Sequence, residues 1–262
     1  MILRQFINNL KKYRYLLYEL IKKDIKLKYR SSILGLFWTL LEPLLTMIVL
    51  TLVFSELLGR GDRYYPVYIL SGRLLYSFFS GGTKAALKSI RSHGAMISKV
   101  YVPKYMYPVA SIVSNYVIFL LSLIVLVAVA AVMKVKPTIH MIGAVIPLLI
   151  LLVLTLGVGM ILATLNVFFR DLEYLWTVAL MLIMYTCAIF YKIEGIKNHL
   201  WIFKYNPLYS VIVNFRNTVL YSVYEQPMDM WHLWYSMGVS IALFAIGLVF
   251  FWRKQDRFIL YV

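Results

Sequence analysis

The sequence predicts an all-α integral membrane protein with six transmembrane helices, and three observations carry that prediction. The chain has 262 residues, is 62% hydrophobic and has a mean hydropathy of +0.78, whereas a soluble domain is nearer half apolar. Several uncharged runs are long enough to cross a hydrocarbon core of about 30 Å, because a helix rises about 1.5 Å per residue. Most of the 27 lysines and arginines lie in segments that alternate with these runs on one predicted side, as the positive-inside rule requires.

The segment from Lys22 to Phe54 determines the predicted orientation of the chain in the membrane. Its first part is crowded with lysine and arginine, and residues 33–54 are almost wholly apolar. A polybasic stretch directly before a spanning helix stays on the cytoplasmic side. The amino terminus is therefore predicted to be inside and the first crossing to span residues 33–58, with Ser31 or Ser32 capping its helix.

Residues 4–30 are predicted to form one amphipathic helix before that crossing. Its apolar residues recur at helical spacing (Phe6, Leu10, Tyr13, Leu17, Leu20 and Ile21), and lysines and arginines occupy the other face. Such a helix is expected to lie in the membrane interface with its apolar side in lipid. A soluble helix packed on another protein domain is the alternative, and both can apply at different points along the helix.

The second crossing is predicted at 64–83 and is followed by a basic cytoplasmic loop at 84–104. This loop is long enough for one or two short surface helices available for docking, with Gly94 as the break between them.

The other crossings are predicted at 107–133, 139–167, 174–191 and 230–252, so that both termini are cytoplasmic. Gly157 and Gly159 in the fourth crossing allow close helix packing. Residues 195–225 do not cross; they are predicted to form short outer-face helices, one of which begins at Asn206-Pro207. Cys187, the single cysteine, is predicted to be a packed small side chain.

Two ionisable residues lie within predicted spans, Glu42 in the first and Arg73 in the second. A charge at this depth is costly unless it faces a partner, a carbonyl or a wet cavity. A Glu42–Arg73 pair, an arginine that lines a channel, and an arginine that lies shallower than counted are the alternatives that the sequence leaves open.

Aromatic residues are abundant, with 21 Tyr, 15 Phe and 6 Trp. Most are expected to be interfacial anchors. Aromatic faces also stack on the apolar faces of sugars, and a group of them on the second crossing would suit a sugar path: Tyr65, Tyr68, Tyr76, Phe78 and Phe79.

No motif for catalysis, metal binding or nucleotide binding is found. Gly81-Gly-Thr-Lys84 lacks the spacing of a phosphate-binding loop, and the four histidines are scattered over different segments. We therefore predict no catalytic, cofactor or metal residue. The net charge of +16 is attributed to topology and anionic lipid rather than to nucleic acid.

The chain resembles the permease subunit of type-2 ABC exporters that move polysaccharides, O-antigens and teichoic acids. The residues that carry the resemblance are Asp24-Ile-Lys-Leu-Lys-Tyr-Arg-Ser-Ser-Ile-Leu-Gly35, then Leu36-Phe-Trp-Thr-Leu-Leu-Glu-Pro43, the Asn166-Val-Phe-Phe-Arg-Asp171 turn and Asn206-Pro-Leu-Tyr209. It covers nearly the whole chain.

This resemblance implies a homodimer in the inner membrane with two copies of a separate ATPase subunit, which would hold ATP and Mg. It implies an ATPase-coupling helix in 84–104 (Ser89, Arg91, Ser92, His93 and Met96), an inner-turn motif (Arg170 and Asp171) and outer gate helices in 195–225 (Asn206, Pro207, Tyr209 and Arg216). The expected cargo is lipid-linked polysaccharide, with O-antigen favoured. A teichoic acid exporter, a small-molecule or drug exporter, and a membrane-embedded glycan or lipid enzyme are the alternatives.

Overall fold

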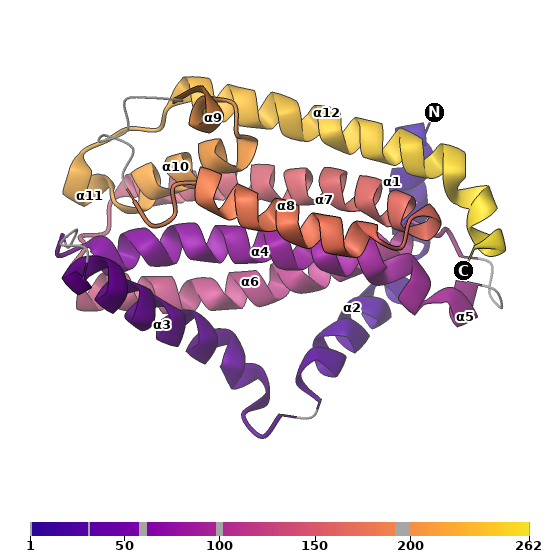
Figure 1. The fold of residues 1–262 in the computed structure, drawn as a ribbon, viewed down its shortest axis with the longest axis horizontal. Coiled ribbons are helices and arrows are strands. Elements are labelled where there is room, and N and C mark those ends of the chain that lie inside the picture. Colours follow the sequence, from indigo (N-terminus) through magenta and orange to yellow (C-terminus); the bar gives the residue numbers. More distant parts are fainter. Residues whose placement is uncertain (1, 31, 58–61, 98–101, 192–199, 262) are drawn as a thin grey trace.

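The computed structural model describes residues 2–30, 32–57, 62–97, 102–191 and 200–261, and over them the chain consists of helices and connections without a strand. Its long helices α4, α6, α7, α8 and α12 run alongside one another, while α2 and α3 diverge from the bundle as the two arms of a V (Figure 1). Within the bundle α4 packs on α6 and α7, and α12 packs on α7.

The helices of the first half have the following bounds: α1 (Ile2–Lys12), α2 (Arg14–Tyr29), the 3₁₀ turn η1 (Gly35–Phe37), α3 (Trp38–Thr51), the π-helical turn η2 (Leu52–Leu57), α4 (Tyr65–Ser92), α5 (Gly94–Ile97) and α6 (Met106–Val132). Those of the second half are η3 (Ile139–Ala144), α7 (Val145–Phe168), α8 (Leu172–Thr186), α9 (Leu200–Lys204), α10 (Pro207–Val219), α11 (Tyr221–Tyr224), α12 (Met230–Lys254) and η5 (Gln255–Leu260).

Four helical stretches in the described part of the chain are long and apolar enough to cross a membrane. They are Gly35–Ser55, Met106–Val132, Ile139–Phe168 and Met230–Phe258. The prediction of an all-α, multi-pass membrane protein is therefore confirmed. The other two predicted crossings correspond to α4 and α8, and α8 is a shorter apolar helix of 15 residues.

Glycine allows α7 and α12 to meet backbone to backbone. A Cβ on Gly157 would lie 2.6 Å from the backbone nitrogen of Phe244, and one on Gly247 would lie 2.7 Å from the carbonyl oxygen of Gly157. Gly159 faces the Ile112 side chain, which would lie 2.7 Å from an added Cβ. The predicted role of Gly157 and Gly159 in close helix packing is confirmed.

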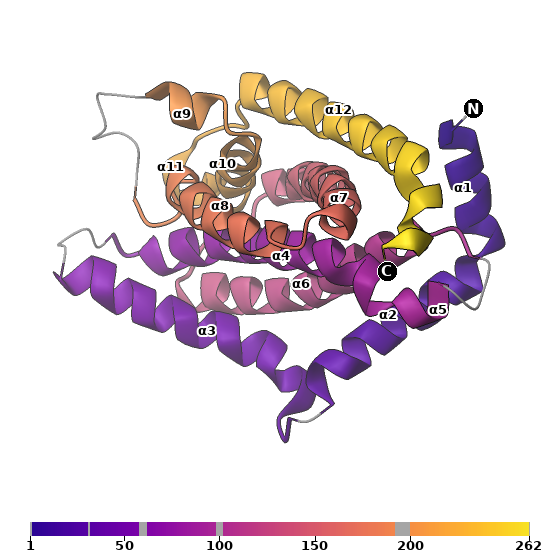
Figure 2. The same ribbon diagram turned by 45° about the vertical axis from the view of Figure 1, so that its right-hand side comes forward.

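The amino-terminal segment differs from the single helix predicted over 4–30. Tyr13, with φ −100° and ψ 22°, separates α1 from α2, and the two helices point in different directions (Figure 2). Phe6 is 6% exposed and packs on Tyr105 and Phe244, with ring centroids 5.1 and 5.9 Å away. The apolar side of α1 thus packs partly on protein, because Tyr105 at the start of α6 and Phe244 within α12 offer it an aromatic surface. Leu20 on α2 is also buried.

The helix that contains Pro43 begins without the predicted serine cap. Its first turn, η1, starts at Gly35, whose φ of +48° favours glycine, and no side chain caps it. Ser31 lies outside the described residues. Only Thr39 and Met47 are buried on α3, and Ser122 Oγ on α6 donates a hydrogen bond of 2.9 Å to the Thr39 carbonyl. Few contacts within one chain therefore hold α3.

We expect Gly157→Ala to lower the melting temperature in detergent, because the new methyl group would collide with the α12 backbone, which cannot rotate away. Gly238→Ala is the matched control on α12, since a Cβ at Gly238 meets nothing within 4 Å. That control should be neutral or stabilising, because alanine favours helix over glycine by about 0.5–1 kcal/mol. Equal melting temperatures for the two variants would contradict the backbone contact.

Candidate functional site

The candidate site is built around α4, which is longer than the crossing predicted for it. Its 28 residues span about 42 Å at about 1.5 Å per residue, and the helix continues past the predicted boundary at residue 83 to Ser92. No helix-breaking residue interrupts the stretch between Thr83 and Gly94, so the first half of the predicted loop is helical. Only α5, from Gly94 to Ile97, is a separate short helix.

Arg216 on α10 binds α4 and the end of α8. The side chain is buried, with 4% of the residue exposed. Its Nε donates to the Tyr68 carbonyl at 3.2 Å, Nη1 to the Ala188 carbonyl at 2.9 Å and Nη2 to the Ile189 carbonyl at 3.0 Å. The guanidinium carbon lies 3.7 Å from the centroid of the Tyr68 ring. We call this set of contacts the Arg216 clamp.

The clamp explains why α8 ends earlier than the predicted residue 191. The helix stops at Thr186, and Ala188 adopts a φ of +47°. Backbone carbonyls that leave a helix inside a membrane protein need other donors. Tyr65 Oη supplies one to the Phe190 carbonyl at 2.6 Å, and Tyr68 Oη supplies one to the Tyr191 carbonyl at 3.0 Å.

The predicted channel aromatics need correction. Tyr65, Tyr76, Phe78 and Phe79 are 3–6% exposed, so they lie inside the chain, and Tyr68 is half-buried. Tyr76 Oη donates to the Leu180 carbonyl on α8 at 2.8 Å. The hydroxyls of the three tyrosines thus bind α4 to the α8 segment, Phe79 packs on Trp176 of α8, and Phe78 packs on Tyr116 and Phe119 of α6. The sequence shows the aromatic faces but not these partners.

At its other end α4 is bound to the first turn of α8. Lys88 Nζ lies 2.9 Å from Glu173 Oε2, and Asn166 Nδ2 donates to the Leu87 carbonyl at 2.9 Å. The Lys88 ammonium holds the pKa of the Glu173 carboxyl below its usual range. A lowered carboxyl pKa means that the ion pair is intact at neutral pH and is lost only as the pH falls through that lowered value. We call this contact the Lys88–Glu173 bridge.

The predicted coupling residues lie beside this bridge but differ in exposure. Ser89 is buried, and its hydroxyl donates to the Ala86 carbonyl at 2.6 Å. The His93 ring stacks on Tyr107 with centroids 4.9 Å apart. Ser92 is exposed, whereas Arg91 and Met96 are half-buried. Four of the five predicted coupling residues are thus accessible to a partner: Arg91, Ser92, His93 and Met96.

The inner-turn residues lie close to the same end of α4. Burial lowers the pKa of Arg91, and the charge of Arg170 lowers it further, while Glu173 opposes both effects. Asp171 is exposed at the start of α8. The α7–α8 turn and the end of α4 therefore form one charged cluster.

Glu42 and Arg73 are not paired in the structure. No ion pair joins their side chains among the described residues; Arg73 Nη1 instead donates to Met184 Sδ at 3.6 Å. Both residues line a cleft between α2, α3, α4 and α6, together with Lys28, whose pKa burial lowers and Glu42 partly restores. The cleft volume of about 80 Å³ accommodates only a few waters, at about 30 Å³ each. The sequence leaves three arrangements open for Arg73. The structure does not contain the first of them, a direct Glu42–Arg73 ion pair.

The predicted outer gate residues lie on and around α10. Asn206 Oδ1 accepts from the backbone nitrogens of Leu208 and Tyr209 at 3.0 and 3.2 Å, and Pro207 is the first helical residue. The predicted start of this helix is confirmed. Asn206 Nδ2 also donates to the Thr186 carbonyl at 3.2 Å, next to the fully buried Cys187.

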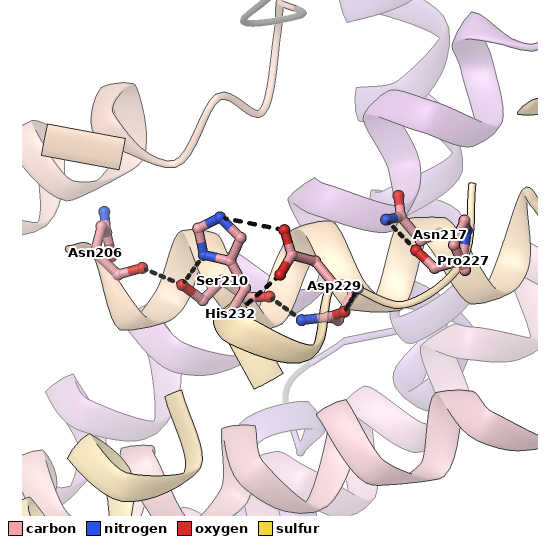
Figure 3. A network of polar contacts seen from close by, with 7 residues as sticks. Asn206, Ser210, Asn217, Pro227, Asp229 and His232 are labelled. Carbon is pink, nitrogen blue, oxygen red and sulfur yellow. Dashed lines mark hydrogen bonds and ion pairs between the residues drawn. The ribbon is translucent and has the colours of Figure 1, made fainter. Parts of the chain in front are cut away.

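A polar network joins α10 to the start of α12 (Figure 3). Ser210 Oγ lies 2.9 Å from His232 Nδ1 and donates to the Asn206 carbonyl at 3.1 Å. Asp229 caps α12 by accepting from the His232 backbone nitrogen at 3.1 Å. Because Arg216 lies on the same helix as Ser210, α10 connects α4, α8 and α12.

These features define a multi-pass helical membrane protein, and no cluster of metal-binding side chains occurs in the part of the chain that the structure describes. The chain belongs to the ABC-2 type transporter family, whose sequence model matches residues 15–220. It is accordingly a transporter protein rather than an enzyme.

Several curated proteins resemble the chain over nearly its full length. An O-antigen export system permease protein RfbA of Klebsiella pneumoniae is 29% identical over 246 residues, which is 93% of each chain. RfbA of Myxococcus xanthus is 27% identical over 257 residues, covering 97% of this chain and 95% of its own. The polysialic acid transport protein KpsM of Escherichia coli is 21% identical over 247 residues, covering 90% and 92%.

Sequence reasoning missed the two features that organise the site. Arg216 is expected from the sequence among the outer gate residues, without its burial, although its position on the apolar stripe of the predicted helix, four residues after Ile212, indicates that it can be buried. For Glu173 the sequence offers no comparable indication of its ion pair, because its partner Lys88 lies in a distant segment of the chain.

We expect Arg216→Met to destabilise the protein strongly, because the carbonyls of Ala188 and Ile189 lose the guanidinium donor and each buried unsatisfied group costs about 1–3 kcal/mol. Arg73→Met is the matched control, since the Arg73 side chain contacts the Met184 sulfur and the Tyr76 ring, and it should change stability by less than about 1 kcal/mol. Thermal unfolding in detergent measures both. Similar losses for the two variants would contradict the clamp.

Proposed function

We propose that this chain is the channel-forming permease of an ATP-driven exporter that moves lipid-linked polysaccharide, O-antigen type favoured, across the inner membrane. The observation that carries the proposal is the end-to-end similarity to O-antigen export permeases, at 27–29% identity over 93% or more of both chains. The similarity to a polysialic acid transport protein makes a polysaccharide of the polysialic acid kind the second candidate cargo.

Six crossings with both termini in the cytoplasm are part of this proposal. The four long apolar stretches supply four of them, and α4 and α8 supply the others. Alone, the 15 residues of α8 reach about 22 Å, which is less than the hydrocarbon thickness of about 30 Å. Residues 187–191 continue the path as buried, non-helical chain, and the Arg216 clamp satisfies the backbone there, as spanning requires.

The export path is proposed to lie between two copies of the chain. The cleft at Arg73 is too small for a sugar polymer, as its volume shows. One face of α8 exposes large apolar and aromatic side chains: Tyr174, Leu175, Val178, Met181, Leu182 and Tyr185. A face of this kind, together with the weakly held α3, supports a homodimer with a wide aromatic path.

Energy would come from two copies of a separate ATPase subunit, which would hold ATP and Mg. The sequence lacks a phosphate-binding loop, so ATP would be hydrolysed by the partner subunit and not by this chain. The exposed coupling residues next to α5 are the proposed contact with that subunit. Closure of the ATPase pair would push on this region and shift α4 together with α8, opening the path between the copies.

The export test uses the chain reconstituted with its ATPase in inverted vesicles that contain fluorescent lipid-linked polysaccharide. We expect ATP-dependent movement of the polymer into the vesicle lumen, where an added glycosidase cannot reach it. A complex whose ATPase carries a substitution in its catalytic carboxylate should give no protection. Protection that does not depend on ATP, or none with the active complex, would refute the proposed function.

The topology test uses single cysteines in the turn after α6 and at the end of α4, where Lys136 and Ser92 are both exposed. We expect Lys136→Cys to react with an impermeant thiol reagent added outside the cell membrane, and Ser92→Cys to react only after permeabilisation. Native Cys187 is fully buried and should stay silent. The reverse pattern, or reaction of both from outside, would contradict six crossings with an inner amino terminus.

A further inference from the structure

The bridge between α4 and α8 lies where a push on the coupling region would enter the bundle. Lys88 is on the last turns of α4, one turn before Ser92, and α5 follows at once. Glu173 is in the first turn of α8. The two side chains meet at 2.9 Å, and Asn166 on α7 contacts both sides, with its Nδ2 donating to the Leu87 carbonyl at 2.9 Å and lying 3.5 Å from Glu173 Oε1.

The charges around Glu173 make it the residue that keeps this junction closed. Lys88 is in direct contact with Glu173. The charge of Arg170 lowers the pKa of Arg91 and that of Glu173 raises it, so these three side chains lie close together. Removal of the Glu173 charge would leave the cations of α4 and of the α7–α8 turn facing one another. Their repulsion would separate the end of α4 from the start of α8.

The bridge adds little to folding stability, which distinguishes it from the Arg216 clamp. The Lys88 side chain is 61% exposed and that of Glu173 is 30% exposed, and ion pairs in such positions contribute little because water screens them. The far end of α8 is held to α4 independently by Arg216, Tyr65 and Tyr68. Trp176 Nε1, one turn after Glu173, donates to Thr83 Oγ1 on α4 at 3.0 Å, and Tyr76 Oη donates to the Leu180 carbonyl at 2.8 Å. Loss of the bridge would therefore free only the first turn of α8, before Trp176, without unfolding the bundle.

We propose that Lys88 and Glu173 are a positioning pair that makes α8 follow α4 when the coupling region moves, so that ATP hydrolysis is converted into movement of the helix that faces the export path. This inference rests on the proposed function. In it α4 moves as one rigid rod, the Arg216 clamp holds the far end of α8, and the bridge holds the near end.

The test compares Lys88→Gln, Glu173→Gln, the double variant and Lys88→Arg in the reconstituted complex with its ATPase. Either neutral variant should lower export at least about fivefold, the lower end of ordinary allosteric coupling, while ATP hydrolysis changes less than about twofold. The double variant should be no worse than Glu173→Gln, because the two residues act as a unit. Lys88→Arg should keep export, because it retains the ion pair.

Lys84→Gln is the matched control, since Lys84 is exposed on α4 one turn earlier and its removal changes the net charge equally. It should behave as the unaltered chain does. Export that is unchanged in the neutral variants, export and hydrolysis that fall together, or additive effects in the double variant would each overturn the proposal. Absence of ATP-dependent export in the unaltered complex would instead overturn the proposed function.

A second measurement tests the bridge without any cargo. Spin labels at Ser92→Cys and Asp171→Cys, both at exposed positions, report the distance between the end of α4 and the start of α8 by pulsed electron resonance. We expect a narrow distance distribution in the otherwise native chain and a broad, longer one with Glu173→Gln. Identical distributions with and without the Glu173 charge would overturn the proposal even where export is impaired.

Discussion

The binding of one buried guanidinium to three backbone carbonyls is the interaction on which the rest of the bundle depends. Hydrocarbon offers no donors, so a chain that leaves its helix inside a membrane must find them within the protein. Arg216 supplies two at the place where α8 ends and a third to the Tyr68 carbonyl on α4, and tyrosine hydroxyls of α4 supply others to the end of α8. A fork of five N–H groups suits this task, whereas a lysine ammonium does not have the same fixed geometry. The clamp lets α8 be short and joins α10 to the two helices that it contacts.

The contacts between α4 and α8 differ in strength at the two ends of α8. The Arg216 end is buried and rich in hydrogen bonds, whereas the Lys88–Glu173 end is exposed and electrostatic. Local openings concentrate where buried contacts are few, so the second end is the one suited to respond to a partner subunit. The stable contacts therefore lie where α10 meets the end of α8, and the adjustable ones where the end of α4 meets the start of α8.

Much of the fold could be predicted from the sequence because hydropathy and charge bias respond directly to the membrane. The apolar runs, the helix start at Asn206-Pro207 and the packing glycines were of this kind. The end of α8, the break at Tyr13 and the burial of Arg216 depend on contacts between segments that are distant in the chain, which no local pattern encodes. The same holds for the tyrosines of the second crossing: their aromatic faces were visible in the sequence, but the α8 carbonyls that receive their hydroxyls were not. Arg73 was recognised as costly, yet only the structure shows that sulfur and an aromatic ring surround it in place of Glu42.

The crossing of α7 and α12 has a consequence for how the protein can change shape. At Gly157 and Gly247 the two backbones touch with no side chain between them. Rotation of either helix about its axis would bring a larger side chain into this contact. The two helices can therefore pack closely in only one rotational orientation. This pair can serve as the stationary frame of the transporter. Rearrangement must then be absorbed by the opposite half of the bundle, where α3 stands apart and α8 keeps one face uncovered.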